Sequence, residues 1–347
     1  ELKTSNRILK EVNNNYKIIN FIQKHFELSK EEIFITATPA NIDRLNGINV
    51  SGIINLKRIN DVRFVNKLFE SINKKLPNFG LLFGCVQTYP NRRKFLLQKY
   101  PPIINRLIYF IDGFSSRVFP KLRLTKKLYF FLTKGKGRAF SRAETYGRLY
   151  SCGFKIIDTE TINDVHYFVA KKTRDPFFDK NPSYGPLITL KRVGKNNKII
   201  NVYKLRTMHP FSEYLQEYVY ERNNLSKGGK IKDDFRVSAE GRFFRRFWLD
   251  ELPMIINLLK GEIKLVGVRP LSQHYFDLYN EELQKERVKY KPGLFPPFYA
   301  DLPSTLDEIM ESEWKYLKSY KTSPYKTDIR YFFLTLKNIF FKGARSK

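Results

Sequence analysis

Two adjacent carboxylates stand at the head of one short stretch, Asp250-Glu251-Leu252-Pro253, which leads into the apolar run 254–259. Proline is favoured in the first turn of a helix and glycine just past its end, so the pattern predicts a short helix that stops at Gly261. The carboxylates would lie at the positive end of the helix dipole, which favours their ionised form. Arginines flank the stretch at positions 245, 246 and 269. Carboxylates beside several guanidiniums indicate a phosphate site with a metal ion between carboxylates and ligand.

An Asp-Glu pair before a helix is also common as a simple N-terminal cap, because the free N–H groups of the first turn prefer acidic partners. The pair alone does not separate a cap from a functional site. The other motifs of the chain have to decide between them.

The net charge limits the kinds of molecule that the chain is expected to bind. The 347 residues include 63 Lys and Arg against 34 Asp and Glu, a formal net charge of +29. Such a surplus predicts an anionic partner, which can be nucleic acid, an anionic bilayer surface or a phosphorylated substrate. No nucleic-acid-binding module is recognisable, so we rank nucleic acid last. Two cysteines are too few for a disulfide framework, and no segment approaches the roughly 20 apolar residues that span a bilayer.

A chain of this length predicts two domains, because single cores stop growing near about 300 residues. We place the first at residues 1–172, a linker rich in Pro, Asp and Asn at 173–186, and the second at 187–347. In the first domain, apolar runs predict strands. From Val62 onward the apolar residues recur at helical spacing, which predicts a helix. Ser141 with Glu144 forms a capping box that opens a second helix. The strands are expected at 33–36, 52–55, 81–86, 154–157 and 166–170. Their alternation with helices predicts an α/β fold with a doubly wound sheet.

The arrangement over residues 30–172 resembles the second half of a class I methyltransferase-like Rossmann domain. In that family a strand before a leucine-rich helix, a glycine turn and a further strand are usual. The glycine-rich loop that would cradle an adenosyl cofactor is absent here. The resemblance therefore implies a degenerate Rossmann-like domain with a structural or regulatory role.

Residues 103–122 combine an apolar pattern with basic flanks, Arg106, Arg117 and Lys121. Such a segment can lie in a membrane interface. It can equally form a helix that packs on the sheet. The sequence leaves both alternatives open.

The second domain opens with a predicted β-hairpin, whose strands 190–193 and 199–208 are joined by a turn at Asn196-Asn197. Taken in order, its motifs resemble those of the bacterial sugar transferase family, the monotopic phosphoglycosyl transferases. The resemblance covers about residues 187–343. The matching residues are Arg192 and Gly194, Lys204-Leu205-Arg206-Thr207-Met208, Asp234 and Arg236, Arg245, Asp250-Glu251-Leu252-Pro253, Asn257 and Gly261, and Arg269-Pro270.

The resemblance implies transfer of a sugar 1-phosphate from a nucleotide-diphosphate sugar to polyprenyl phosphate, initiating a lipid-linked glycan. In the family, the Asp of the Asp-Glu pair attacks the phosphorus next to the sugar and a covalent phosphosugar–aspartate forms. By position, Asp250 is the nucleophile and Glu251 the Mg²⁺ ligand. The alternative is a catalytically silent scaffold that binds a nucleotide-sugar or a lipid phosphate.

Residue chemistry supports this expectation. A carboxylate nucleophile needs no base to activate it. The repulsion between this anion and a diphosphate must be neutralised by metal and guanidinium groups. Arg245 and Arg269 are expected to grip phosphate oxygens in bidentate fashion. Further substrate-binding candidates by position are Arg192, Lys204, Arg206, Asp234, Arg236 and Glu313.

The sequence departs from the family pattern at several points. Val268 replaces the first proline of Pro-Arg-Pro, and Lys291 replaces the arginine of an Arg-Pro-Gly turn. The run 294–299 differs from the usual Thr-Gly-Trp. A polar linker stands where the family has a hydrophobic re-entrant helix, so membrane attachment must come from other surfaces.

Residues 328–341 offer such a surface, a basic amphipathic helix that either meets an anionic bilayer or docks on the catalytic core. The resemblance implies a peripheral or monotopic protein at the cytoplasmic face of the bacterial inner membrane. Self-association into a homo-oligomer is left open.

Overall fold

The computed structural model describes residues 15–28, 33–36, 50–177, 179, 184–222, 225–226, 230–231 and 234–344. The chain divides into two compact units, one made of residues 1–184 and 209–218, the other of 185–208 and 219–347. The boundary between residues 184 and 185 falls inside the predicted linker, of which residues 178 and 180–183 lie outside the described ones.

One segment differs from the predicted division. Residues 209–218 lie in the range assigned to the second domain, yet they pack in the first unit. The Arg148 guanidinium lies 4.3 Å from the centroid of the Phe211 ring. A Cβ atom on Gly147 would approach the carbonyl oxygen of Phe211 to 2.2 Å, so this glycine permits the close contact.

The first unit contains a five-stranded sheet in the order β1-β2-β3-β5-β4. Strands β1, β2 and β3 are parallel, whereas β5 is antiparallel to both β3 and β4. The antiparallel step follows from a two-residue turn at Asn163 and Asp164, both with positive φ, which is typical of a tight hairpin. The predicted strands are confirmed, but the sheet is mixed rather than wholly parallel. Their bounds are β1 (Ile33–Thr36), β2 (Gly52–Arg58), β3 (Leu81–Val86), β4 (Phe154–Ile162) and β5 (Val165–Lys172).

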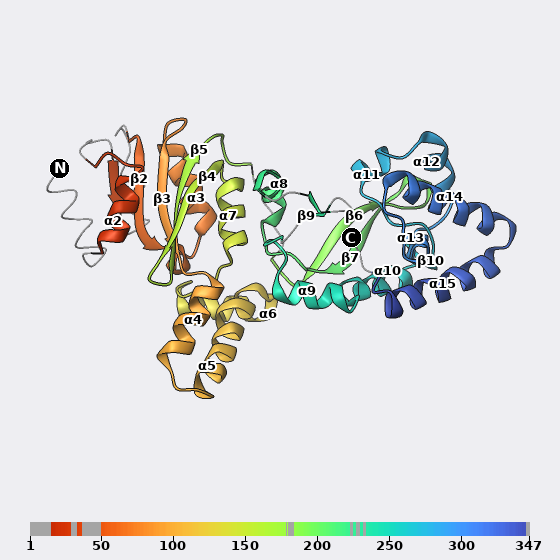
Figure 1. The fold of residues 1–347 in the computed structure, drawn as a ribbon, viewed down its shortest axis with the longest axis horizontal. Coiled ribbons are helices and arrows are strands. Elements are labelled where there is room, and N and C mark those ends of the chain that lie inside the picture. Colours follow the sequence, from red (N-terminus) through yellow and green to blue (C-terminus); the bar gives the residue numbers. More distant parts are fainter. Residues whose placement is uncertain are drawn as a thin grey trace. The chain divides into compact units, whose positions relative to one another are not determined.

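Helices cover both faces of this sheet (Figure 1). Helix α2 (Tyr16–Gln23) packs its apolar side against one face, in a core that includes Phe83. Helices α3 (Val65–Lys75) and α7 (Arg142–Ser151) lie on the other, where Lys172 Nζ donates to the Asn73 carbonyl at 2.8 Å. The predicted capping box opens α7, since Ser141 Oγ accepts the N–H of Glu144 at 2.9 Å.

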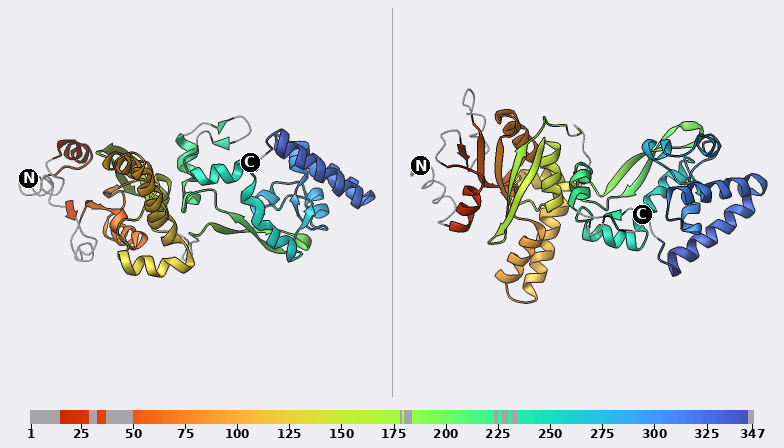
Figure 2. Two further views of the ribbon diagram at one scale, coloured as in Figure 1. Left: turned by 90° about the horizontal axis from the view of Figure 1, so that it is seen from below. Right: turned by 45° about the horizontal axis from the view of Figure 1, so that its top comes forward.

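Beyond the ends of β2 and β3, a group of helices projects from the sheet (Figures 1 and 2). It consists of α4 (Tyr89–Lys99), α5 (Ile104–Gly113), a π-helical turn (Phe114–Val118), a 3₁₀ turn (Phe119–Lys121) and α6 (Arg123–Thr133). No residue of α5 is buried. Packing of segment 103–122 on the sheet, one of the two expected alternatives, is therefore wrong.

The second unit begins with the predicted hairpin, β6 (Leu187–Val193) paired antiparallel with β7 (Ile199–Leu205). The left-handed residues Asn196 and Asn197 form its turn. Strands β10 (Lys264–Val266) and β11 (Gly293–Phe295) form a separate parallel pair. The other elements of the unit are α9 (Ala239–Arg246), the 3₁₀ helix η7 (Leu249–Met254), α10 (Ile255–Leu259), α11 (Gln273–Asp277), α12 (Glu281–Arg287), α13 (Pro297–Asp301), α14 (Leu306–Thr322) and α15 (Pro324–Phe341). The short elements α8 (Gln216–Arg222), β8 (Leu225–Ser226) and β9 (Lys230–Ile231) lie between β7 and α9 in the chain.

Helices α14 and α15 form a helical hairpin (Figure 2). The rings of Tyr316 and Tyr331 meet edge to face at 5.1 Å, and Ile339 joins the same core. The opposite side of α15 leaves Phe340 and Phe341 exposed. The amphipathic segment thus docks on the core and still presents apolar side chains. Within the parts of the chain that the structure describes, every helix is too short or too polar to cross a membrane.

A buried asparagine ties the hairpin to the predicted catalytic stretch. Asn257, in α10, accepts the N–H of Tyr203 at 3.0 Å and donates to the Asn201 carbonyl at 2.7 Å and to Glu262 Oε2 at 2.6 Å. Its exposed fraction is 0%. Three bonds from this fully buried side chain fix β7 beside η7 and α10.

Asn257→Ala is expected to lower the free energy of unfolding by about 3 kcal/mol or more, because buried partners on β7 lose their hydrogen bonds. Equilibrium denaturant unfolding measures the change. The control Asn280→Ala removes only the N-cap of α12, where Asn280 Oδ1 accepts the N–H of Leu283, and should cost about 1 kcal/mol. Equal losses in the two variants would contradict the proposed tie.

Candidate active site

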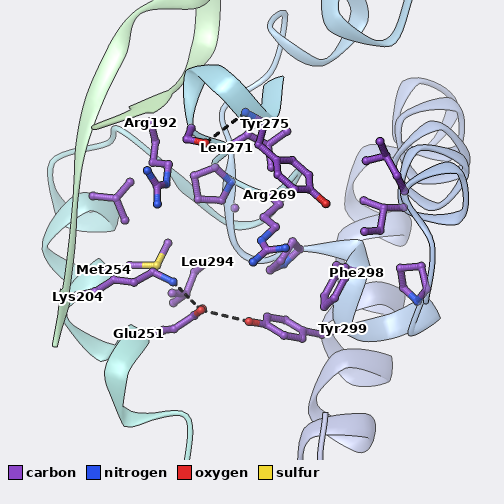
Figure 3. Close-up of a pocket in the computed structure, with 18 of the residues that line it drawn as sticks. Arg192, Lys204, Glu251, Met254, Arg269, Leu271, Tyr275, Leu294, Phe298 and Tyr299 are labelled. Atoms are coloured by element: carbon purple, nitrogen blue, oxygen red, sulfur yellow. Dashed lines mark hydrogen bonds and ion pairs between the residues drawn. The ribbon is translucent and has the colours of Figure 1, made fainter. Parts of the chain in front are cut away.

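A pocket of about 410 Å³ lies among the elements of the second unit (Figure 3). Its charged lining residues are Arg192 from β6, Lys204 from β7, Arg269 after β10, and Glu251 from η7. Burial, and then the charge of Arg269, lowers the pKa of Arg192, which reflects how closely cations are gathered here. Three cations against one carboxylate leave the pocket with a surplus of positive charge, which favours an anionic ligand.

Glu251 is held from two sides. Its Oε1 accepts from Lys204 Nζ at 2.7 Å and from the Tyr299 hydroxyl at 3.1 Å (Figure 3). The residue is 4% exposed. A strand, a 3₁₀ helix and α13 therefore meet at one carboxylate oxygen, which fixes the orientation of Glu251 towards the pocket.

Asp250 precedes Glu251 in the chain. It is 5% exposed and is not among the pocket-lining residues. Its Oδ1 is buried and has no hydrogen-bond partner in the described structure. A buried carboxylate oxygen left without a partner is costly and uncommon, so it marks a functional candidate.

The expected lowering of the carboxyl pKa by the helix dipole is wrong for Asp250. Burial raises the pKa of this carboxyl, the neighbouring charge of Glu251 raises it further, and Lys204 and Arg245 oppose the shift. The predicted short helix does begin at the carboxylates and end at Gly261, whose φ is +68°. The dipole of so short a helix does not offset the loss of water around Asp250.

Four other predicted binding residues lie outside the pocket lining. Arg206 donates to the Gly185 carbonyl at 3.0 Å, and Arg245 donates to Thr207 Oγ1 at 3.0 Å. Asp234 and Arg236 form a bidentate pair with bonds of 2.9 and 2.7 Å. Of these four, Arg245 acts on Asp250 through its charge.

Glu313 lies behind the pocket as a buried support. It is 1% exposed and forms an ion pair with Arg287 Nε at 3.2 Å. Arg287 in turn donates to the carbonyl of Arg269 at 2.5 Å. Glu313 therefore holds the loop that carries Arg269, and the structure does not bring it into the pocket as a substrate ligand.

Tyr299 and Phe298 were not predicted as site residues. Both line the pocket, and the Arg269 guanidinium lies 5.1 Å from the centroid of the Phe298 ring. They belong to the run 294–299, which departs from the family pattern. That departure is the signal that could have identified them, since a hydroxyl and a flat ring placed there replace other recognition groups.

The described residues contain no group of three or more His, Cys, Asp and Glu side chains arranged to hold a metal ion. Mg²⁺ is nevertheless often bound by one or two carboxylates together with substrate phosphates. Glu251 lines the pocket, and Asp250, the residue before it, has a buried oxygen without a partner in the described structure. One carboxylate in the pocket fits a magnesium ion that would take its other ligands from substrate phosphates.

Comparison with known proteins agrees with this geometry. The galactosyl transferase CpsE of Streptococcus agalactiae is 33% identical over 158 residues, which cover 44% of this chain and 34% of the relative. The uncharacterized sugar transferase EpsL of Bacillus subtilis is 40% identical over 103 residues, 30% of this chain and 45% of the relative. The undecaprenyl-phosphate galactose phosphotransferase of Salmonella typhimurium is 36% identical over 108 residues, 30% of this chain and 22% of the relative.

The chain thus spans less than half the length of these three relatives. Residues 179–342 match the family model described as bacterial sugar transferase. This range holds Arg192, Lys204, Asp250, Glu251 and Arg269. The family model and these relatives agree on the same family, so residues 179–342 of this chain are similar to bacterial sugar transferases.

Proposed function

We propose that the chain transfers a sugar 1-phosphate from a nucleotide-diphosphate sugar to polyprenyl phosphate, the first step of a lipid-linked glycan. The pocket that gathers three cations around Glu251, the residue that follows Asp250 in the chain, carries the proposal. Two relatives support the acceptor class by their names, an undecaprenyl-phosphate galactose phosphotransferase and a UDP-N-acetylgalactosamine-undecaprenyl-phosphate N-acetylgalactosaminephosphotransferase from Aeromonas hydrophila.

In the proposed first step, an Asp250 carboxylate oxygen attacks the phosphorus that bears the sugar. The bond from that phosphorus to the nucleoside monophosphate breaks, and an acyl phosphate forms. A polyprenyl phosphate oxygen then attacks the same phosphorus and releases the Asp250 carboxylate. The low exposure of Asp250 favours this route, because exclusion of water protects an acyl phosphate from hydrolysis.

Arg192, Lys204 and Arg269 would bind the donor phosphates and hold the reacting phosphorus close to Asp250. Magnesium bound through Glu251 would supply further charge neutralisation for the diphosphate. Tyr299 and Lys204 orient Glu251 for that role by holding its Oε1.

The acceptor class places the reaction at the cytoplasmic face of the inner membrane in this proposal. Exposed apolar side chains on the second unit, among them Leu259, Phe340 and Phe341, are suited to meet lipid. The chain would then be a peripheral or monotopic enzyme.

The burial of Asp250 also motivates a second candidate, a silent scaffold that binds the donor without turnover. Both candidates use the same cationic pocket. They differ in one respect only, the covalent step at Asp250.

Asp250→Asn is expected to abolish release of nucleoside monophosphate, because the amide is not a nucleophile. Donor alone should add the mass of one sugar phosphate to the native chain and nothing to the variant, as read by intact-mass measurement. Asp277→Asn, which alters an exposed carboxylate bonded to Gln273, is the matched control and should retain the adduct. Turnover that survives Asp250→Asn would reject the assigned nucleophile. Donor binding by the native chain without an adduct or turnover would favour the scaffold.

The raised pKa of Asp250 predicts how the rate of the first step should depend on pH. Attack requires the ionised carboxylate, so the single-turnover rate should fall on acidification at a higher pH than for an ordinary aspartate. Lys204→Met removes a positive charge that lowers the pKa of Asp250, so the fall in rate on acidification should begin at a higher pH. Glu251→Gln removes a negative charge that raises the pKa of Asp250, so the fall in the residual rate on acidification should begin at a lower pH. Lys204→Arg keeps the charge as control, and shifts in the same direction for Lys204→Met and Glu251→Gln would contradict the assignment.

A further inference from the structure

The helical projection of the first unit carries an apolar face on its outer side. On α5 and the turns around it the exposed residues recur at helical spacing along one stripe, and α6 repeats the pattern. We define this projection face by its exposed side chains, Ile103, Ile104, Leu107, Phe110, Ile111 and Phe114 together with Leu124, Leu128, Phe131 and Leu132. Phe110 is 65% exposed, Phe131 is 80% and Leu124 is 94%. Large apolar side chains that recur along two successive helices mark an interaction surface, unlike single exposed ones.

The charge around this face is almost entirely of one sign. Residues 89–138 contain 13 Lys and Arg and one acidic residue, Asp112. Asp112 is neutralised by Arg92 in a bidentate pair with bonds of 2.7 and 2.5 Å. Arg106, Lys126 and Lys127 are exposed on the same helices. Apolar side chains flanked by lysine and arginine match a bilayer with anionic headgroups in both chemistry and charge.

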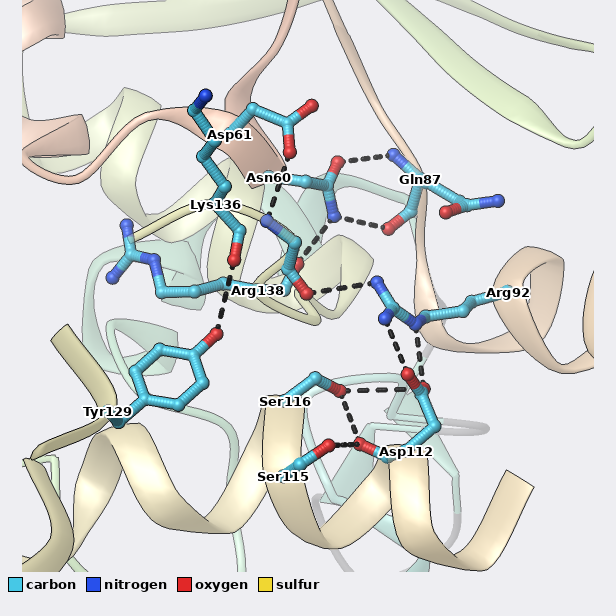
Figure 4. A network of polar contacts seen from close by, with 11 residues as sticks. Asn60, Asp61, Gln87, Arg92, Asp112, Ser115, Ser116, Tyr129, Lys136 and Arg138 are labelled. Atoms are coloured by element: carbon cyan, nitrogen blue, oxygen red, sulfur yellow. Dashed lines mark hydrogen bonds and ion pairs between the residues drawn. The ribbon is translucent and has the colours of Figure 1, made fainter. Parts of the chain in front are cut away.

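A polar network holds the base of the projection (Figure 4). Asn60, after β2, donates to the carbonyls of Gln87 and Arg138 at 2.9 and 2.7 Å. The Arg92 guanidinium joins the Asp112 carboxylate of α5 to the Gly137 carbonyl, the latter at 3.0 Å. The helices are therefore fixed at their polar base while their apolar side faces outward, so the exposure does not result from a loosely attached segment.

We propose that the projection face inserts into the headgroup region of an anionic bilayer and anchors the first unit there. The proposal is independent of the transfer reaction, because the projection carries none of the sugar transferase motifs. A second copy of the chain is a poor occupant, since two surfaces with this basic surplus repel each other. Insertion satisfies both parts of the surface, the apolar stripe in the acyl boundary and the cations among the headgroups.

A fluorophore on an introduced cysteine tests insertion directly. Cys85 and Cys152 are free, with exposed fractions of 2% and 0%, so Leu128→Cys in the full chain labels selectively. An environment-sensitive label at position 128 should shift to the blue and escape an aqueous quencher on vesicles of phosphatidylcholine with about one third phosphatidylglycerol. Phosphatidylcholine alone should give a much smaller change. Phe79→Cys, 70% exposed at the opposite end of β3, is the control and should not respond.

The absence of a response at position 128, or an equal response at 79, would overturn the proposal. A concentration-dependent response without vesicles would overturn it in favour of self-association. A response to an acidic polypeptide that exceeds the response to the vesicles would overturn it in favour of a protein partner.

A variant that combines Leu107→Ser, Phe110→Ser, Leu128→Ser and Phe131→Ser tests the contribution to binding. Its partition onto the anionic vesicles should fall at least about tenfold, because four side chains lose their apolar burial. The circular dichroism spectrum and the thermal unfolding midpoint should stay close to those of the native chain, which shows that the variant is folded. Asp250→Asn should bind vesicles like the native chain, so loss of catalysis and loss of insertion remain distinguishable. Native partition in the four-site variant would overturn the proposal.

Discussion

The arrangement of the pocket in the second unit depends on one carboxylate oxygen, Oε1 of Glu251, which accepts two hydrogen bonds. Glu251 Oε1 joins a lysine on β7 to a tyrosine on α13, and through them connects parts of the chain that are almost 100 residues apart, from 204 to 299. A buried ion pair contributes little net stability by itself, because both charges lose water. Its value here is positional, since the same lysine lowers the pKa of Asp250 and lines the pocket. Asn257 on one side and the Glu313–Arg287–Arg269 series on the other keep the supporting backbone in place.

Much of this architecture was predictable because local chemistry decides it. A serine and a glutamate three residues apart opened α7 as expected, two asparagines formed the β6–β7 turn, and Gly261 ended the short helix. The ordered motifs also identified the pocket cations Arg192, Lys204 and Arg269 together with Glu251.

The misses have a common physical cause, which is that they depend on tertiary packing. Burial, not the position in the helix, sets the direction of the Asp250 pKa shift. Glu313 and Arg236 were expected to bind substrate, and both are buried in ion pairs, with Arg287 and Asp234 respectively. Tyr299 reaches Glu251 only because α13 folds back onto η7. The pairing of β5 with β3 joins segments far apart in the chain, which strand propensity does not encode.

The membership of residues 209–218 in the first unit has a consequence for how such chains diversify. The backbone leaves the transferase region after Met208 and rejoins it after Tyr218, while Phe211 and Leu215 are 2% and 0% exposed. A single recombination event between residues 184 and 185 would supply the second unit without the first. Residues 209–218 would then lose the core in which they pack. A recombinant that keeps this packing has to carry the two units together, or to change residues 209–218 at the same time.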